Sequence, residues 1–267
     1  MKPVLNALAV IVIAACCNNA AAFLPESNPV PGGVAVVPLV KSQTEKPLAW
    51  FGRRRLLVTQ EAGTWYAIIG LGVDQVPGQY IIKFSTDSLR ETTQPFNVYT
   101  GSSELSKAQD SNTANNDSVD NKQQKPEFLN TLEQLWTDTN TPDLPLHTPV
   151  TNITANLNTN NAFFGLAYDL PTGVEILTPA AGTVALAQDS DEFGHVLAIH
   201  HGRGLISLFL NLNNSLVTPE QRLPQSEVIA VVSVNKKEAQ APLLWVVILN
   251  GNQINPHNLL FKTKPER

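Results

Sequence analysis

The stretch FFGLAYDLPTG, residues 163–173, decides the fold. Aromatic and small residues run into a Pro-Thr-Gly turn, which is the pattern of a short buried strand followed by a reverse turn. The stretch has one carboxylate, Asp169, and no histidine. It belongs to a series of short apolar runs, joined by Pro, Gly and Asn turns, that spans residues 149–262. Many short strands without intervening helices predict an antiparallel sheet, and the chain is predicted to be all-β.

A second group of apolar runs lies nearer the N-terminus. Residues 28–99 contain VAVVPLV, TWYAIIGLGV and QYIIKFS, which are separated by Gly and Pro turn signals. β-branched and aromatic runs at this spacing predict a small all-β domain, most simply a sandwich.

The segment between the two groups differs from both. Residues 100–125 are dominated by Ser, Asn, Asp and Gln, so this segment cannot bury enough apolar surface to offset the entropy of ordering. It is predicted to be a disordered linker. A helix and connector are predicted for residues 126–148, because apolar side chains there share a helical stripe: Phe128, Leu129, Leu132, Leu135 and Trp136. This stripe predicts a helix packed on its own domain.

The first residues have the pattern of an export signal. One cation, Lys2, precedes an apolar run that is too short to cross a bilayer, and small residues follow. Cleavage after residue 22 predicts a secreted chain, whereas cleavage after residue 15 would leave a lipidated Cys16 as a membrane anchor. Cys16 and Cys17 are the only cysteines, so no disulfide framework or thiolate zinc site is expected in the folded part.

The charge balance argues against a nucleic-acid partner. The chain has 18 Lys and Arg against 23 Asp and Glu, and its one basic run is Arg53-Arg54-Arg55. Binding to phosphate backbones depends on clustered cations. We therefore expect no nucleic acid, and we interpret the arginine run as a solvated turn or an edge-strand guard.

Three blocks in order carry a resemblance to a known family. PTGVEILTPAAGTV (171–184), HGRGLISLFLNL (201–212) and NGNQINP (250–256) resemble blocks of the LytM or lysostaphin-type zinc metallopeptidases, which cut peptide cross-links in bacterial cell walls. The region from 28 to 99 is similar to the small β domain that precedes the peptidase domain in many members. The resemblance implies a LytM-type, duplicated hybrid motif-like domain over residues 149–262.

The resemblance also locates the zinc ligands, which the family takes from HxxxD and from the second His of HxH. Counting from the Pro-Thr-Gly turn places Phe163 at the His and Ala167 at the Asp, and counting back from Asn250 places Leu244 at the second His. None of these side chains can bind a metal, so we expect no zinc. Zinc is expected only if this register is wrong.

The catalytic positions are also changed. Asn211 stands at the family's YxHL histidine, and Pro242 stands at the first His of HxH. The count to HxH tolerates a shift of one residue, which would select Leu243 and Trp245 instead. No shift supplies a nitrogen ligand. The histidines all fall outside the site positions: His147, His195, His200, His201 and His257.

The leading hypothesis is a catalytically inactive LytM-like protein of the bacterial periplasm that binds peptidoglycan or regulates a cell-wall hydrolase. Two alternatives remain open: an active zinc endopeptidase with displaced ligands, and a structural subunit of an envelope assembly. A cleft that accepts an extended peptide can bind without hydrolysis. The candidate groove residues are Phe163, Ala167, Asn211, Leu244 and Trp245.

Overall fold

A computed structural model describes residues 24–41, 45–86, 90–101, 125–138, 142, 144–159, 163–233 and 241–260. The predicted export signal, with Cys16, and nearly all of the predicted linker lie outside these residues. No helix in the described part of the chain is long and apolar enough to span a membrane. The described elements are antiparallel strands with one α-helix among them, which confirms the all-β prediction.

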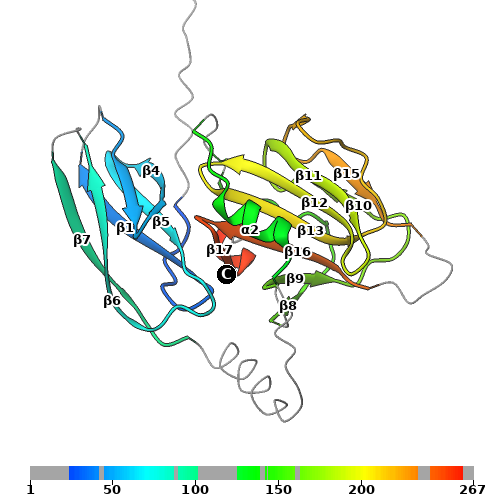
Figure 1. The fold of residues 1–267 in the computed structure, drawn as a ribbon, viewed down its shortest axis with the longest axis horizontal. Helices are drawn as coiled ribbons and strands as arrows, with labels where there is room; N and C mark the ends of the chain where they lie inside the picture. The colour runs from blue at the N-terminus through cyan, green and yellow to red at the C-terminus, as the bar shows by residue number, and fades with distance from the viewer. Residues whose placement is uncertain are drawn as a thin grey trace, which may run out of the picture.

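The N-terminal strands form two sheets that face each other across a shared core (Figure 1). One sheet has the order β1 (Val34–Lys41), β5 (Thr64–Gly70), β4 (Leu57–Glu61). The other has the order β3 (Arg54–Arg55), β2 (Leu48–Phe51), β6 (Gly78–Ser85), β7 (Glu91–Val98). Alternating residues such as Ile82 and Phe84 point into the core, as expected for half-buried strands.

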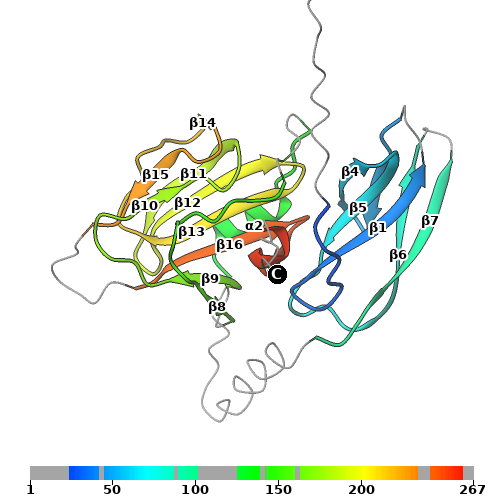
Figure 2. The ribbon, with the colours of Figure 1, turned by 180° about the vertical axis from the view of Figure 1, so that it is seen from behind.

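The C-terminal strands form an eight-stranded sheet. Its order is β14 (Arg222–Leu223), β11 (Gly182–Ser190), β12 (Gly194–Gly202), β13 (Leu205–Leu212), β16 (Leu243–Leu249), β9 (Gly165–Tyr168), β8 (Asn156–Asn158), and β17 (Asn252–Ile254) pairs with β16. A two-stranded sheet of β10 (Glu175–Leu177) and β15 (Val228–Val231) lies near β11 (Figure 2). A 3-10 helix, Pro256–Leu259, follows β17.

Both faces of this sheet are covered, which explains why its central strands are buried almost throughout. The helix α2 (Glu127–Gln134) lies in front of β13 and β16 in Figure 1 and behind them in Figure 2. Leu129 and Leu132, one helical turn apart, are buried in the cluster that contains Ile206 and Leu208 of β13. The predicted helix is therefore present, and it packs on the C-terminal sheet.

The two domains share a hydrophobic core. Val34 and Ile68 of the small domain belong to the same buried cluster as Leu249 and Ile254 of the large one. A Cβ on Gly70 would lie 2.5 Å from the carbonyl oxygen of Leu249, so only glycine permits this close approach. Backbone hydrogen bonding continues across the contact, where the Asn255 N–H donates to the Gly32 carbonyl at 2.7 Å.

The arginine run has the position that the sequence suggested, because Arg53 is exposed in a turn and Arg54 and Arg55 form the edge strand β3. The run also joins the two domains. Arg54 donates to the carbonyl of Asn250 at 2.9 Å. Arg55 pairs with Asp138 at 2.8 Å, and its guanidinium lies 5.2 Å from the ring centroid of Trp136. The flat guanidinium suits this combination of carboxylate and aromatic partners.

Candidate functional site

The three family metal positions come together in the fold. Strand β9 pairs with β16 in a register that places Ala167 directly opposite Leu244. Phe163, just before β9, belongs to the same apolar cluster as these two residues. The three residues that the resemblance assigns to the metal therefore lie together in the fold.

The position of the first ligand is occupied by an aromatic cluster. The Phe163 side chain is 5% exposed. Its ring stacks on Phe128 of α2 with centroids 6.3 Å apart and meets Phe193 edge to face at 5.1 Å. Both geometries are favourable for aromatic pairs. The helix thus covers the face of the sheet on which a metal would have to lie.

The side chains at these positions do not fit zinc, which requires nitrogen, sulfur or carboxylate donors. Phenylalanine, alanine and leucine offer none. Within the described ranges, no group of three or more His, Cys, Asp or Glu residues is placed to hold a metal ion. No chemical step can be assigned to a zinc ion at this position.

The structure also bears on the two possible positions of the HxH pair, which are Pro242 with Leu244 or Leu243 with Trp245. Leu244 faces the α2 side with Phe163, whereas its neighbours Leu243 and Trp245 belong to the cluster on the opposite face. Trp245 is 0% exposed, so the prediction that it lines a groove is wrong. Successive residues of a strand point to opposite faces, and the pairing register fixes which face each one takes.

Gly165, between the first two metal positions, has a structural role. A Cβ at this residue would lie 2.3 Å from the carbonyl oxygen of Trp245 and 3.0 Å from the Val246 Cα. Backbone atoms cannot move aside without breaking the β9–β16 pairing. The glycine is therefore required by the close approach of the two strands.

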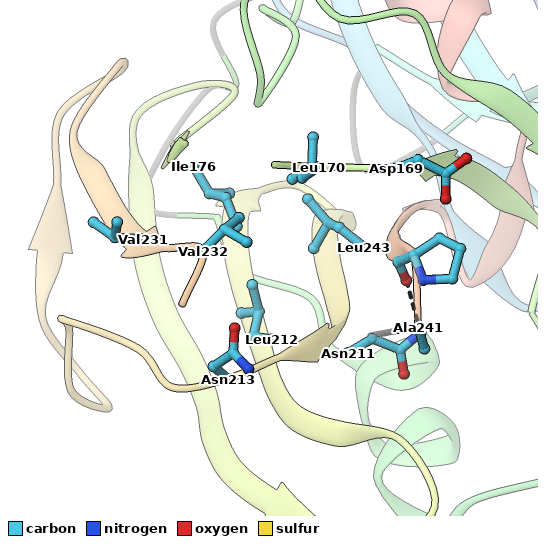
Figure 3. A pocket seen from close by; sticks show the side chains of 11 residues that line it. Asp169, Leu170, Ile176, Asn211, Leu212, Asn213, Val231, Val232, Ala241 and Leu243 are labelled. Carbon is cyan, nitrogen blue, oxygen red and sulfur yellow. Dashed lines mark hydrogen bonds between the residues drawn. The ribbon is translucent and has the colours of Figure 1, made fainter. Parts of the chain in front are cut away.

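The two catalytic positions lie beside an open pocket of about 270 Å³ (Figure 3). Asn211, at the end of β13, has φ of 64°, a left-handed conformation that asparagine tolerates better than most residues. Its Nδ2 donates to the carbonyl of Pro242 at 2.8 Å. The two residues that the resemblance places at the catalytic positions are thus joined by a hydrogen bond in the pocket wall.

The pocket has an apolar floor and a polar rim. Figure 3 shows aliphatic side chains turned toward one another, from Ile176, Leu212, Val232 and Leu243. The exposed residue Asp169 lies at the rim, away from the aliphatic side chains of the floor. An apolar floor with a few polar groups is typical of a ligand site.

The adjacent histidines His200 and His201 point in different directions, as expected for neighbours on a strand. His201 is 1% exposed, with Nδ1 3.0 Å from the Ala181 carbonyl oxygen and Nε2 2.9 Å from Ser207 Oγ. Burial lowers the pKa of His201 to about 4 and also lowers the pKa of His200. His201 is a neutral structural residue, because the carbonyl accepts from Nδ1 and the hydroxyl can donate to Nε2.

A chain of hydrogen bonds around His195 resembles a catalytic triad in its order. His195 Nδ1 lies 2.6 Å from Asp189 Oδ1, and Nε2 lies 2.9 Å from Ser215 Oγ. Ser215, however, donates its proton to the Val217 carbonyl at 3.0 Å. The serine proton is therefore directed at a carbonyl and not at the imidazole, unlike the arrangement of an activated serine nucleophile. Sequence reasoning missed this chain because it depends on the strand register, which places His195 opposite Asp189 across β11 and β12.

The comparisons with known proteins agree with this architecture. Residues 162–256 match Peptidase family M23, and residues 27–100 match the Peptidase family M23 N-terminal domain. Together the two matches span more than half of the chain. The protein is a LytM-type member of family M23.

Solved structures show the same relationship. A crystal structure of a protein assigned to peptidase M23 from Pseudomonas aeruginosa is 26% identical, with 87% of this chain and 95% of that chain covered at a TM-score of 0.69. The similarity therefore includes both domains. A zinc-containing peptidase from Vibrio cholerae is 14% identical, covering 69% of this chain and 50% of that chain with a TM-score of 0.39. A similarity this low adds nothing about the site.

Proposed function

We propose that this protein is a non-hydrolytic LytM-type protein of the bacterial periplasm that binds peptidoglycan peptides in the pocket beside Asn211. The observation that carries the proposal is the contrast between two neighbouring places. The metal positions are filled by packed apolar side chains, whereas the catalytic positions border an open pocket.

The chemistry of the family explains why this contrast favours binding over cleavage. A zinc ion in such a site lowers the pKa of bound water and polarises the amide carbonyl. The side chains of Phe163, Ala167 and Leu244 cannot hold that ion, and neither Asn211 nor Pro242 can act as a general base at neutral pH. The pocket retains shape and hydrogen-bonding groups, which are sufficient for binding.

A sedimentation assay with purified sacculi tests the proposal. The mature protein should pellet with the sacculi, release no soluble fragments and contain far less than one zinc per chain by elemental analysis. Ala241→Trp places a large ring on an exposed residue of the pocket wall and should reduce pelleting. Val76→Trp, at a residue of the small domain that is 67% exposed, is the matched control and should pellet like the parent protein.

Two outcomes would contradict the proposal. Release of soluble fragments with stoichiometric zinc would make the protein an active endopeptidase with ligands from elsewhere in the chain. Full pelleting of the Ala241→Trp variant would place the binding surface outside this pocket.

A further inference from the structure

The pocket wall has one charged side chain within the described residues, the carboxylate of Asp169. None of the ion pairs between described residues involves Asp169. No Lys, Arg or His contributes to this wall. Among the described residues, the pocket therefore presents negative charge at its rim.

The amide groups of the wall add acceptors. Asn211 Nδ2 is engaged with the Pro242 carbonyl, which fixes the orientation of the amide and leaves Oδ1 as its available acceptor. Asn213 Oδ1 accepts from the Ser233 N–H at 3.1 Å, so it too is oriented as an oxygen. A ligand that matches this wall brings hydrogen-bond donors and a positive charge.

The floor adds the second requirement. Aliphatic side chains from β10, β13, β15 and β16 or the residues beside them converge there, and they favour a carbon chain over a polar group. We infer that the pocket selects a peptide in which an aliphatic side chain lies next to a free primary ammonium, as at a free amino terminus. This inference rests on the proposed function and specifies its ligand.

The geometry assigns each part of the ligand a place. The aliphatic side chain enters the floor between Ile176 and Leu212, and the ammonium stays at the rim near Asp169. An ammonium has three N–H donors, and the carboxylate of Asp169 can accept from it. Capture of a terminal amine by oxygen acceptors is an established mode of peptide recognition.

The expected preference is modest, because Asp169 is exposed and an exposed pair is weakened by solvent. We expect a free amine to bind about three-fold more tightly than its acetylated form at low salt. Salt at about 0.5 M should remove most of this preference, since exposed charges are screened over a few ångströms.

The experiment compares two tripeptides on the full mature protein by NMR titration: Leu-Gly-Gly and N-acetyl-Leu-Gly-Gly. The parent protein should prefer the free amine, and Asp169→Asn should bind both tripeptides equally. Asp74→Asn, an exposed carboxylate change in the small domain, should keep the preference. Gly-Gly-Gly should bind more weakly than Leu-Gly-Gly, because it lacks the aliphatic side chain.

Each other outcome has a distinct meaning. Equal binding of both tripeptides by the parent protein would overturn the amine inference and leave the proposed function intact. Binding of neither tripeptide would also overturn it, and the sacculus assay would then decide the proposed function separately. Retention of the preference by Asp169→Asn would assign the charge recognition to another residue and overturn the role given to Asp169.

Discussion

The family site has a metal end, at Phe163, Ala167 and Leu244, and a catalytic end, at Asn211 and Pro242. These two ends differ in how they are packed. At the metal end, Phe163 is buried against the helix α2 and the cluster is closed. At the catalytic end, Asn211 and Pro242 border a pocket that remains open. Side chains without metal-binding atoms can join the core, whereas the proposed binding surface must stay accessible. The comparison teaches that the two ends are under different physical demands.

The largest expected effect comes from opening the closed end. Phe163→Ala removes a buried ring that contacts Phe128 and Phe193, and it should lower the free energy of unfolding by about 3–5 kcal/mol. Urea unfolding, monitored by fluorescence, measures this change in the free energy of unfolding. Leu170→Ala in the half-buried pocket wall is the control and should cost much less. Equal costs would mean that the two ends are equally packed.

A pH change tests the packing of β12 and β13 through the buried residue His201. Its pKa is about 4 in the folded protein and 6.5 in the unfolded chain, so the unfolded chain binds a proton first as the pH falls. Stability should be unaffected by this group above pH 6.5 and should fall by about 3 kcal/mol between pH 6.5 and pH 4.

Urea unfolding at pH 7.5 and pH 5 measures this loss. The exposed His147 offers a control, since His147→Gln should leave the pH dependence unchanged. A folded His201→Asn variant should lose most of this pH dependence of stability. A parent protein with the same stability at both pH values would show that His201 becomes protonated without unfolding the sheet.

Gly165 tests the strand pairing that brings the metal positions together. Gly165→Ala should cost about 1–3 kcal/mol, because the added Cβ would meet the backbone of Trp245 and Val246. Gly173→Ala is the comparison variant, because Gly173 lies at a turn where nothing is within 4 Å of the added Cβ. Its φ of 87° disfavours alanine, so this variant measures the cost of backbone strain without a clash. If Gly165→Ala left the free energy of unfolding unchanged, β9 and β16 would be less closely paired than in this structure.

The smallest effect is expected at the open end. Asn211→Ala loses the hydrogen bond to Pro242 and places alanine at φ of 64°, so it should cost about 1–2 kcal/mol. Asn211→Gly loses the same bond without the strain and should cost less than Asn211→Ala. Thermal unfolding of both variants measures the difference. Equal losses would assign the whole effect to the hydrogen bond.

Much of the fold could be predicted from local patterns. The turn signals and β-branched runs predict the strands, and the stripe around Leu129 and Leu132 predicts the helix α2. The covering of the former metal face could not be predicted. It depends on where α2 lies against Phe163 and the strands of the sheet, and the stripe only indicates that the helix has an apolar face.

The candidate site divides in the same way. The sequence shows that Phe163, Ala167 and Leu244 lack metal-binding atoms, whichever way they point. It could not place Trp245, because a shift of one residue reverses the face of every side chain on a strand. The pairing of Ala167 with Leu244 settles that register, and it assigns Trp245 to the opposite core.

The sequence by itself determined the all-β architecture and the chemical character of the ligand positions, because both depend on residue type and short-range spacing. Only the tertiary structure decided that the metal end is closed by Phe128, that the catalytic end stays open near Asp169, and that the two domains share a core. These features depend on contacts between residues far apart in the chain. Such contacts are fixed by register and packing, which no local pattern specifies.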